Sequence, residues 1–501
     1  MDTLSCVLIL LLTCVVTQAF LSIVVGRNKA KYKLPPGPFP LPIIGNLLAL
    51  GNKPHQSLTK LAKIHGPILA LKLGQVTTII VSSAELAKQV LQTHDSSLSD
   101  RTVPQALSAL NHDQFGVGFL CVTPLWRDMR RICKNQLFSN KTLDASQYLR
   151  RKKIEDLLSD VNQSCISGEA VNIGGAAFKT SLNSLTNTIF SIDFIQNSSD
   201  TGEYKDIVMG ILKAVGTPNM ADFFPLLKTI DPQGIKKSYA CYIGKLFHVF
   251  DNLIHQRLKL REGTNYVTNN DMLDALLDIS EDNSKEMDNE KIKHLLHDLL
   301  VGGTDTTAYA LEWAMAEVLH NPNAMSKAKK ELEETVGIGK PIEESDIVRL
   351  PYLQAIIKET LRLHPIAPLL LPRKARTDVE LNGYIIPKGA QILVNEWAIG
   401  RDPESWDNPN LFSPERFLGS KVDIQGKNFE LTPFGSGRRI CPGMPLAIRM
   451  LHLMLGSLIN SFNWKLENGM KSEEMDMEEA IQGLAIRKSE TLRVVPIKIS
   501  I

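Results

Sequence analysis

One cysteine near the end of the chain, Cys441, lies in the stretch FGSGRRICPG, with three glycines, two adjacent arginines and a proline. Glycine permits a left-handed backbone and close backbone approach. The stretch leads into a nearly all-apolar run, so we expect Cys441 just before the N-terminus of a buried helix, where unpaired N–H groups stabilise a thiolate. Such a thiolate suits an axial ligand of a haem iron, with Arg439 free to pair with a propionate. The alternative is a structural cysteine buried in a turn.

A second feature interrupts the longest helical pattern of the chain, which covers residues 294–319. Its middle reads GGTDTT, with apolar residues on both sides. Each of the glycines, Gly302 and Gly303, costs a helix about 1 kcal/mol relative to alanine, and threonines that bond back to carbonyls bend the turn. A polar patch facing solvent is the alternative. The interruption of an apolar run instead indicates a function for Asp305 and Thr306.

The elements that must position these residues are predicted to be mainly helical. Residues 66–83 alternate around a Gly-Gln turn and predict a β-hairpin. Apolar residues at three and four spacing predict helices over 84–370, with an exposed loop at 279–291. Strand patterns return at 373–395 and at the C-terminus. Past residue 45 there is no repeat or long low-complexity linker, which favours one large domain, mainly α with small β-sheets, over residues 46–501.

Charge and cysteine content exclude several classes of protein. The 501 residues carry a net charge of +2, which gives no support to binding of nucleic acid or of a strongly acidic partner. The seven cysteines are scattered and form no CxxC pair. This pattern indicates reduced thiols and argues against a zinc cluster built on cysteines.

The N-terminus carries the pattern of a membrane anchor. Residues 4–25 are uncharged and apolar, and a helix of this length would span about 30 Å, the thickness of a bilayer core. Basic residues follow the run rather than precede it, which favours an uncleaved transmembrane anchor at 1–26 over a cleaved signal peptide. These charges are expected to stay cytosolic, with the bulk of the chain. Residues 27–45 are basic and proline-rich and predict a stiff hinge.

The residues around Cys441 resemble the haem-binding signature of the cytochrome P450 family. The order Phe434, Gly437, Arg439, Cys441, Gly443 leaves no position of that pattern broken. The resemblance covers essentially the whole chain and implies the cytochrome P450 fold, in a single domain after the anchor. It also implies haem b with Cys441 as the axial ligand of the iron, and the other four residues as contacts of the cofactor.

The same resemblance implies roles for residues elsewhere. In GGTDTT, Thr306 would hydrogen-bond the iron-bound oxygen and Asp305 would help to relay protons. In LWRDMRRICK, Trp126 and Arg130 would bind haem propionates, with a basic surface helix as the alternative. Arg373 follows a proline-rich turn and is a further candidate for a propionate contact.

A third motif concerns support of the haem side of the core. Glu359 and Arg362 in KETLRLHP are spaced i, i+3 on one predicted helix face. Taken alone, they could be a surface ion pair worth less than about 1 kcal/mol. The resemblance implies instead a buried triad with Arg416 of PERF.

The expected activity is that of a membrane-anchored monooxygenase. It would take electrons from NADPH through NADPH–cytochrome P450 reductase, use O2, and lie in the endoplasmic reticulum membrane as a single-pass protein with a cytosolic catalytic domain. A haem-thiolate isomerase or dehydratase is one alternative, although such enzymes often lack the acid–alcohol pair of Asp305 and Thr306. A haem-binding sensor or carrier without turnover is another.

In detail the chain resembles the plant microsomal subfamily that contains geraniol 8-hydroxylase, so the expected substrate is a small apolar terpenoid, a monoterpene alcohol such as geraniol. A diterpene or a prenylated phenolic compound is the alternative. The pocket is expected to draw on residues 103–119, 208–214, 300–304, 366–371 and 482–486. Within the first segment, polar residues 111–114 are expected to face water rather than to bond a substrate hydroxyl.

Overall fold

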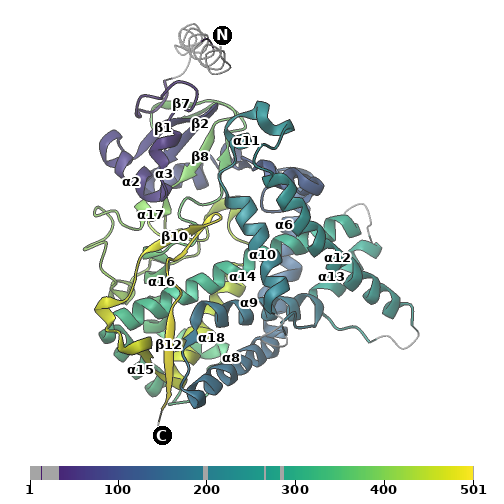
Figure 1. The fold of residues 1–501 in the computed structure, drawn as a ribbon, viewed down its shortest axis with the longest axis vertical. Helices are drawn as coiled ribbons and strands as arrows, with labels where there is room; N and C mark the ends of the chain where they lie inside the picture. Colours follow the sequence, from purple (N-terminus) through teal and green to yellow (C-terminus); the bar gives the residue numbers. More distant parts are fainter. Residues whose placement is uncertain (1–12, 14–32, 196–200, 264–266, 283–286, 500–501) are drawn as a thin grey trace, which may run out of the picture.

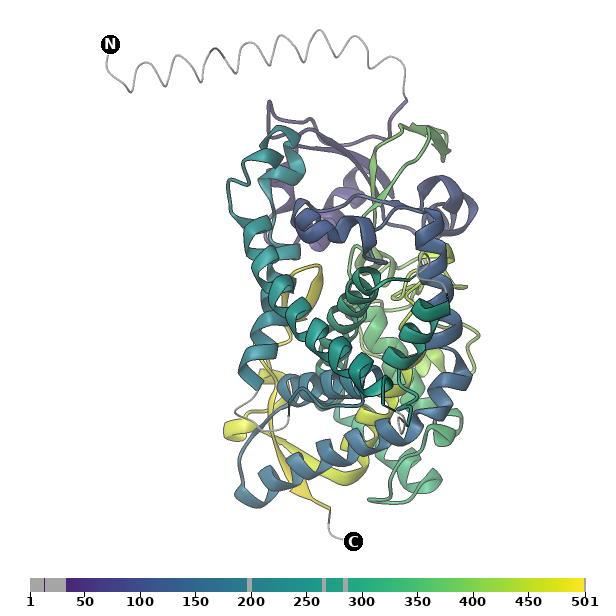
Figure 2. The same cartoon turned by 90° about the vertical axis from the view of Figure 1, so that its right-hand side faces the viewer.

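The computed structural model describes residue 13 and residues 33–195, 201–263, 267–282 and 287–499. A five-stranded sheet lies at one end of the molecule, and helices with smaller sheets form the rest of it (Figures 1 and 2). Its strand order is β1-β2-β8-β5-β3. The bounds of these strands are β1 Ile68–Leu73, β2 Val76–Val81, β3 Asp100–Arg101, β5 Arg373–Lys374 and β8 Gln391–Val394.

The predicted hairpin is confirmed as the antiparallel pair β1–β2. Its turn holds Gly74 with a φ of +56°, a conformation that glycine adopts without strain. β8 pairs with β2 in parallel, which joins the hairpin to a part of the chain more than 300 residues away. The strand patterns of 373–395 therefore complete a sheet that the N-terminal hairpin begins.

The centre of the helical part is α14 (Asn289–His320), which packs against several other helices. It is longer than the predicted range, because the side chain of Asp288 caps its N-terminus by accepting from the N–H of Lys291. The loop predicted at 279–291 is therefore wrong at both ends, since α13 (Met272–Asp282) and the first turn of α14 take part of it. Residues 283–286 lie outside the described part. The helices packed against α14 include α9 (Ile173–Phe190), α12 (Ile235–Arg261), α16 (Pro351–Leu363) and α18 (Met444–Ser461).

The remaining elements surround these helices and form three smaller sheets. The other helices are α2 Pro54–His65, α3 Ala84–Lys88, α4 Asp95–Leu98, α5 His112–Phe115, α6 Pro124–Ile132, α7 Asn140–Ala145, α8 Gln147–Ser167, α10 Thr201–Gly216, α11 Met220–Phe223, α15 Pro322–Thr335 and α17 Glu396–Ile399. The other strands are β4 Val171–Asn172, β6 Val379–Leu381, β7 Tyr384–Ile386, β9 Phe462–Leu466, β10 Glu479–Gln482, β11 Ala485–Lys488 and β12 Arg493–Lys498. The prediction of a mainly α fold with small β-sheets is confirmed.

The structure describes part of the predicted hinge at 27–45 and almost none of the predicted anchor. The anchor at 1–26 lies outside the described residues, apart from residue 13. No helix in the described ranges is long and apolar enough to cross a bilayer. The described part of the hinge, from residue 33, runs along the sheet, where the carbonyl of Pro36 accepts from the N–H of Ala70 at 2.9 Å.

Candidate active site

The cysteine loop is held in one shape by its own backbone. The N–H of Cys441 donates to the carbonyl of Phe434 at 2.9 Å, which closes the loop just before α18. Gly435 and Gly437 have φ values of +70° and +69°. A Cβ on Gly437 would also lie 2.2 Å from the carbonyl oxygen of Leu91, so no other residue fits there without a shift of the backbone.

The thiol of Cys441 lies against the start of α18, as predicted. Burial raises its pKa, whereas hydrogen bonds from the N–H groups of Gly443 and Met444 and the charge of Arg130 oppose that rise. The helix start alone therefore does not make a thiolate here. Coordination to a metal ion would produce the thiolate, because a thiol that binds a metal is deprotonated outright. The other described cysteines are also free thiols.

A group of four arginines surrounds the loop, three of them buried and Arg130 half-buried. Its members are Arg101, Arg130, Arg373 and Arg439. Burial lowers the pKa of all four, and repulsion from the others lowers those of Arg101 and Arg439 further. Asp95, which binds Arg373 at 2.9 Å, and Asp100 offset only part of this charge. An excess of buried positive charge of this kind suits a ligand with anionic groups.

Sequence reasoning missed Arg101. The strand pair β3–β5 brings it opposite Arg373, more than 270 positions later in the chain. Its guanidinium donates to the carbonyls of Leu371 at 2.6 Å and Gly118 at 3.2 Å. No local spacing in the sequence marks this residue, since only the register of the sheet places it here.

Trp126 on α6 lies between two of the arginines. The guanidinium of Arg439 is 4.3 Å from the centre of its ring and that of Arg130 is 5.9 Å away. Its indole N–H donates to the carbonyl of Val117 at 3.1 Å. Arg130 donates to the carbonyl of Ile440, next to the cysteine, at 2.7 Å. The structure thus brings Trp126 and Arg130 to the cysteine loop, with the indole donor directed at a backbone carbonyl.

The middle of α14 opens onto free space on one face. Gly302 and Thr306, one turn apart, are exposed, although residues on both sides of them along the helix are buried. A Cβ built on Gly302 would meet no described atom within 4 Å. Thr306 Oγ1 donates back to the carbonyl of Gly302 at 2.7 Å. Gly303 has a different reason to be glycine, because a Cβ there would lie 2.8 Å from the side chain of Leu185.

Asp305 points away from that face. It is buried next to the hydroxyl of Tyr309 and near Lys205 of α10, and its Oδ2 has no hydrogen-bond partner in the described structure. Burial raises its pKa to about 6, and Tyr309 and Lys205 limit the rise. A carboxyl group with such a pKa takes up and releases protons near neutral pH. The carboxyl group of Asp305 and the hydroxyl group of Thr306 therefore lie on different sides of α14.

The Glu359 triad is assembled in the core. Arg362 binds both carboxylate oxygens of Glu359, at 2.7 and 2.8 Å, and both side chains are fully buried. Arg416 reaches the same carboxylate at 3.0 Å. A surface ion pair is thereby excluded, and the triad joins α16 to the segment that precedes the cysteine loop.

The prediction that residues 111–114 face water is wrong for one of them. His112 is buried, and its ring nitrogens lie 2.8 Å from His294 and 3.0 Å from Asp298. Asn111 and Gln114 are exposed, as expected. The pattern failed at His112 because its partners lie on α14, more than 180 residues away.

Some segments expected to form the pocket do meet. The N–H of Ile486 donates to the carbonyl of Ile366 at 2.9 Å, and the amide of Gln482 lies 3.3 Å from the sulfur of Met209 on α10. The segment 482–486 is therefore in contact with residues 366–371 and with residues 208–214, as the predicted pocket requires.

Comparisons with known proteins agree with this geometry. The cytochrome P450 family model matches residues 35–492. The chain is 50% identical to a geraniol 8-hydroxylase of Catharanthus roseus, with 99% of each chain covered. It is 49% identical to a geranylhydroquinone 3''-hydroxylase of Arnebia euchroma (93% of this chain, 94% of the relative) and 47% identical to a ferruginol synthase of Isodon rubescens (97% of each).

The cofactor that this family implies is a haem whose iron is held by an axial cysteine thiolate, and the residues present fit it. A free cysteine lies in a backbone loop that accepts only glycine at one position. Buried arginines with excess charge lie beside it and suit the two propionates. Free space at Gly302 lies along the longest helix. The chain belongs to the cytochrome P450 family of haem-thiolate monooxygenases.

Proposed function

We propose that the protein hydroxylates a small apolar terpenoid in a reaction that needs NADPH and O2, and that the best substrate is a monoterpene alcohol such as geraniol. The observation that carries the reaction type is the exposed pair Gly302 and Thr306 in the middle of a buried helix. A haem-thiolate isomerase or dehydratase needs no such pair. The identity to a geraniol 8-hydroxylase over 99% of the chain supports the substrate.

In this proposal Cys441 Sγ is the axial ligand of the haem iron. Arg101, Arg130, Arg373 and Arg439 hold the propionates, and Trp126 fills the space between two of these arginines. Phe434 closes the loop through its carbonyl, and Gly437 and Gly443 let the backbone approach the cofactor. When bound, the haem supplies an iron that activates O2 with electrons delivered by NADPH–cytochrome P450 reductase.

Protons for that chemistry are delivered by side chains of α14. Asp305, with a pKa of about 6, takes up a proton on the side of Lys205 and Tyr309. Thr306 Oγ1, now bonded to the carbonyl of Gly302, would hold a water by turning about its Cα–Cβ bond. Free space at Gly302 leaves room for a small molecule beside the hydroxyl. Because Asp305 and Thr306 lie on different sides of the helix, a proton would pass between them through water rather than by direct contact.

The substrate is expected to be held mainly by apolar side chains. Residues 366–371 are aliphatic or proline and suit a prenyl chain, and the β10–β11 turn closes against them. A prenylated phenol is a second candidate, because the geranylhydroquinone hydroxylase is 49% identical. A diterpene is the third.

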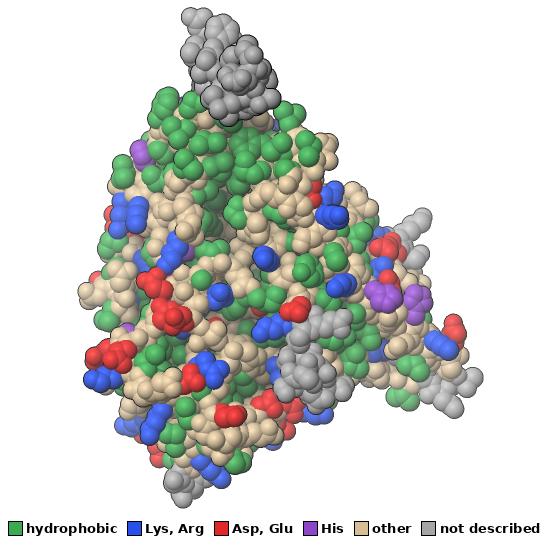
Figure 3. Space-filling model, viewed as in Figure 1, with side chains coloured by type: hydrophobic (Ala, Val, Ile, Leu, Met, Phe, Trp, Pro, Cys, Tyr) green, Lys and Arg blue, Asp and Glu red, His purple; other side chains and the backbone are tan. Residues whose placement is uncertain are grey.

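We also propose that the chain is anchored in the endoplasmic reticulum membrane by residues 1–26. The support within the described residues is an apolar surface at the sheet end of the molecule, where hydrophobic side chains gather (Figure 3). The N–H of Gln75 in the hairpin turn donates to the carbonyl of Phe223, which places α11 there. Large exposed apolar side chains lie in the neighbouring segments, Phe39 and Leu48 before the hairpin and Leu226 and Ile230 after α11.

The test uses microsomes that carry the chain and a plant reductase. Geraniol is added with and without NADPH, and products are identified by mass spectrometry. We expect hydroxylated geraniol only with NADPH, and its loss in Thr306→Val. The matched control is Thr180→Val on α9, a buried helical threonine with the same back-bond to a carbonyl, at 2.9 Å.

Other outcomes separate the alternatives. If a prenylated phenol or a diterpene gives product and geraniol does not, the protein is still a monooxygenase, but its substrate differs from the one proposed. NADPH consumption that stays at background with all three substrates, in protein with intact haem, would contradict the monooxygenase and favour a sensor or carrier.

A further inference from the structure

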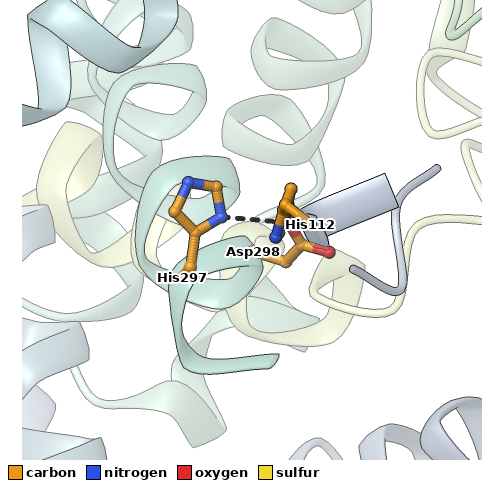
Figure 4. Close-up of side chains that lie close together, drawn as sticks. All are labelled: His112, His297 and Asp298. Atoms are coloured by element: carbon orange, nitrogen blue, oxygen red, sulfur yellow. Dashed lines mark hydrogen bonds and ion pairs between the residues drawn. The ribbon is translucent and has the colours of Figure 1, made fainter. Parts of the chain in front are cut away.

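Three side chains from two distant parts of the chain, two of them buried and one half-buried, meet beside the active site. His112 lies on α5, and His297 and Asp298 lie on α14 (Figure 4). One ligand atom from each lies within 4.8 Å of those of the other two. We call these three residues the His-Asp cluster. Nothing in the proposed reaction uses it.

The spacing of its atoms is that of a metal-binding set. Asp298 Oδ1 lies 3.0 Å from His112 Nε2 and 3.2 Å from His297 Nδ1. In a tetrahedral zinc site with bonds of about 2.0–2.1 Å, neighbouring ligand atoms are about 3.3 Å apart. Two imidazoles and a carboxylate are a recurrent set of protein ligands for zinc, with water in the fourth position. Asp298 is 14% exposed, which leaves an approach for that water.

Each of the three side chains also has a polar contact on the side away from the centre of the cluster, which fixes its orientation. His112 Nδ1 lies 2.8 Å from His294 Nδ1, and His297 Nε2 lies 3.3 Å from the hydroxyl of Tyr239. Asp298 Oδ2 accepts from the N–H of Gly118 at 2.9 Å. In metal sites such outer contacts set the orientation and tautomer of the ligands.

The cluster holds one carboxylate, that of Asp298, whose oxygens face two imidazoles and a backbone N–H. Among the residues that the structure covers, no lysine or arginine forms an ion pair with Asp298. A buried negative charge without a basic partner favours a cation.

We propose that His112, His297 and Asp298 bind one divalent zinc ion, which fastens the loop around α5 to α14. On binding, the ring nitrogens that now face Asp298 would turn to the ion, with the outer ring nitrogens toward His294 and Tyr239. The ion is structural. It holds Gly118, whose N–H binds Asp298 and whose carbonyl binds Arg101 of the arginine group.

The test measures zinc bound to the purified haem-loaded enzyme. The protein is treated with EDTA, dialysed against buffered zinc, and analysed for zinc per chain by mass spectrometry, with the thermal unfolding midpoint recorded in both states. We expect one tightly bound zinc and a midpoint that rises with zinc. Asp298→Asn should weaken binding by more than about 100-fold, beyond the 10–100-fold typical of outer contacts, and Tyr239→Phe should fall in that outer-contact range.

The matched control removes two surface histidines of α12, by His248→Gln and His255→Gln, and should leave zinc content unchanged. A wild-type enzyme that holds no zinc overturns the proposal without any variant, since the cluster is then only a hydrogen-bond network. Loss of zinc in the surface control, or equal binding by Asp298→Asn with intact haem, overturns it as well.

Discussion

Replacing Glu359 by glutamine tests the buried triad most sharply. The carboxylate of Glu359 accepts from Arg362 at 2.7 and 2.8 Å, from Arg416 at 3.0 Å and from the N–H of Ser413 at 2.8 Å. The side chains of Glu359 and Arg362 are both 0% exposed. Glu359→Gln keeps the shape and removes the charge, so the guanidinium of Arg362 stays buried without its counter-charge.

Removal of one partner from a buried ion pair costs about 3–5 kcal/mol of unfolding free energy. Ordinary domains have only about 5–15 kcal/mol in total. We therefore expect Glu359→Gln to lose a fifth or more of its stability and to be recovered with little haem. Denaturant unfolding of the haem-loaded protein, followed by far-ultraviolet circular dichroism and by haem absorption, measures both effects.

The control is Glu155→Gln on α8, where Glu155 pairs with Arg151 at 3.2 Å and the two side chains are 58% and 51% exposed. Exposed pairs of this kind contribute about 0.3–0.5 kcal/mol. If Glu359→Gln were no less stable than Glu155→Gln, the reasoning about the triad would be refuted.

Three further perturbations have defined outcomes. Gly437→Ala should lose haem, because a Cβ there meets a backbone oxygen at 2.2 Å, whereas Gly244→Ala on α12, where a Cβ meets no atom within 4 Å, should keep it, as the haem-to-protein ratio will show. The pKa of Asp305 is raised from 3.8 to about 6, so the unfolding free energy should fall by about 2 kcal/mol as pH rises from 4 to 7; this pH-dependent loss should be absent in Asp305→Asn. Gly302→Leu should fold, since it fills open space, and should change the site of hydroxylation in the product spectrum.

Much of the scaffold could be predicted, because its signals are local. The Gly-Gln turn between alternating residues gave the β1–β2 hairpin, and the apolar run after Cys441 gave the buried helix α18. The polar interruption of α14 marked Gly302 and Thr306 as unusual, and they are the exposed residues of that region.

What could not be predicted depends on contacts between distant parts of the chain. Arg101 joins the other arginines only through the register of β3 on β5. His112 meets Asp298 across 186 positions, and no spacing in the sequence connects them. Adjacent residues of a helix always point in different directions, but which of Asp305 and Thr306 is buried depends on how the helix packs, which the pattern alone does not set.

The most direct test of the central claim is the absorption spectrum of the reduced, CO-bound protein in Cys441→Ser. Cys121→Ser is the matched control, because Cys121 is also a half-buried free thiol near Arg439. If Cys441 binds the haem iron, Cys441→Ser loses both the thiolate-type spectrum and NADPH-dependent product formation, and Cys121→Ser keeps both. A Cys441→Ser protein that retains the thiolate-type spectrum would contradict the account.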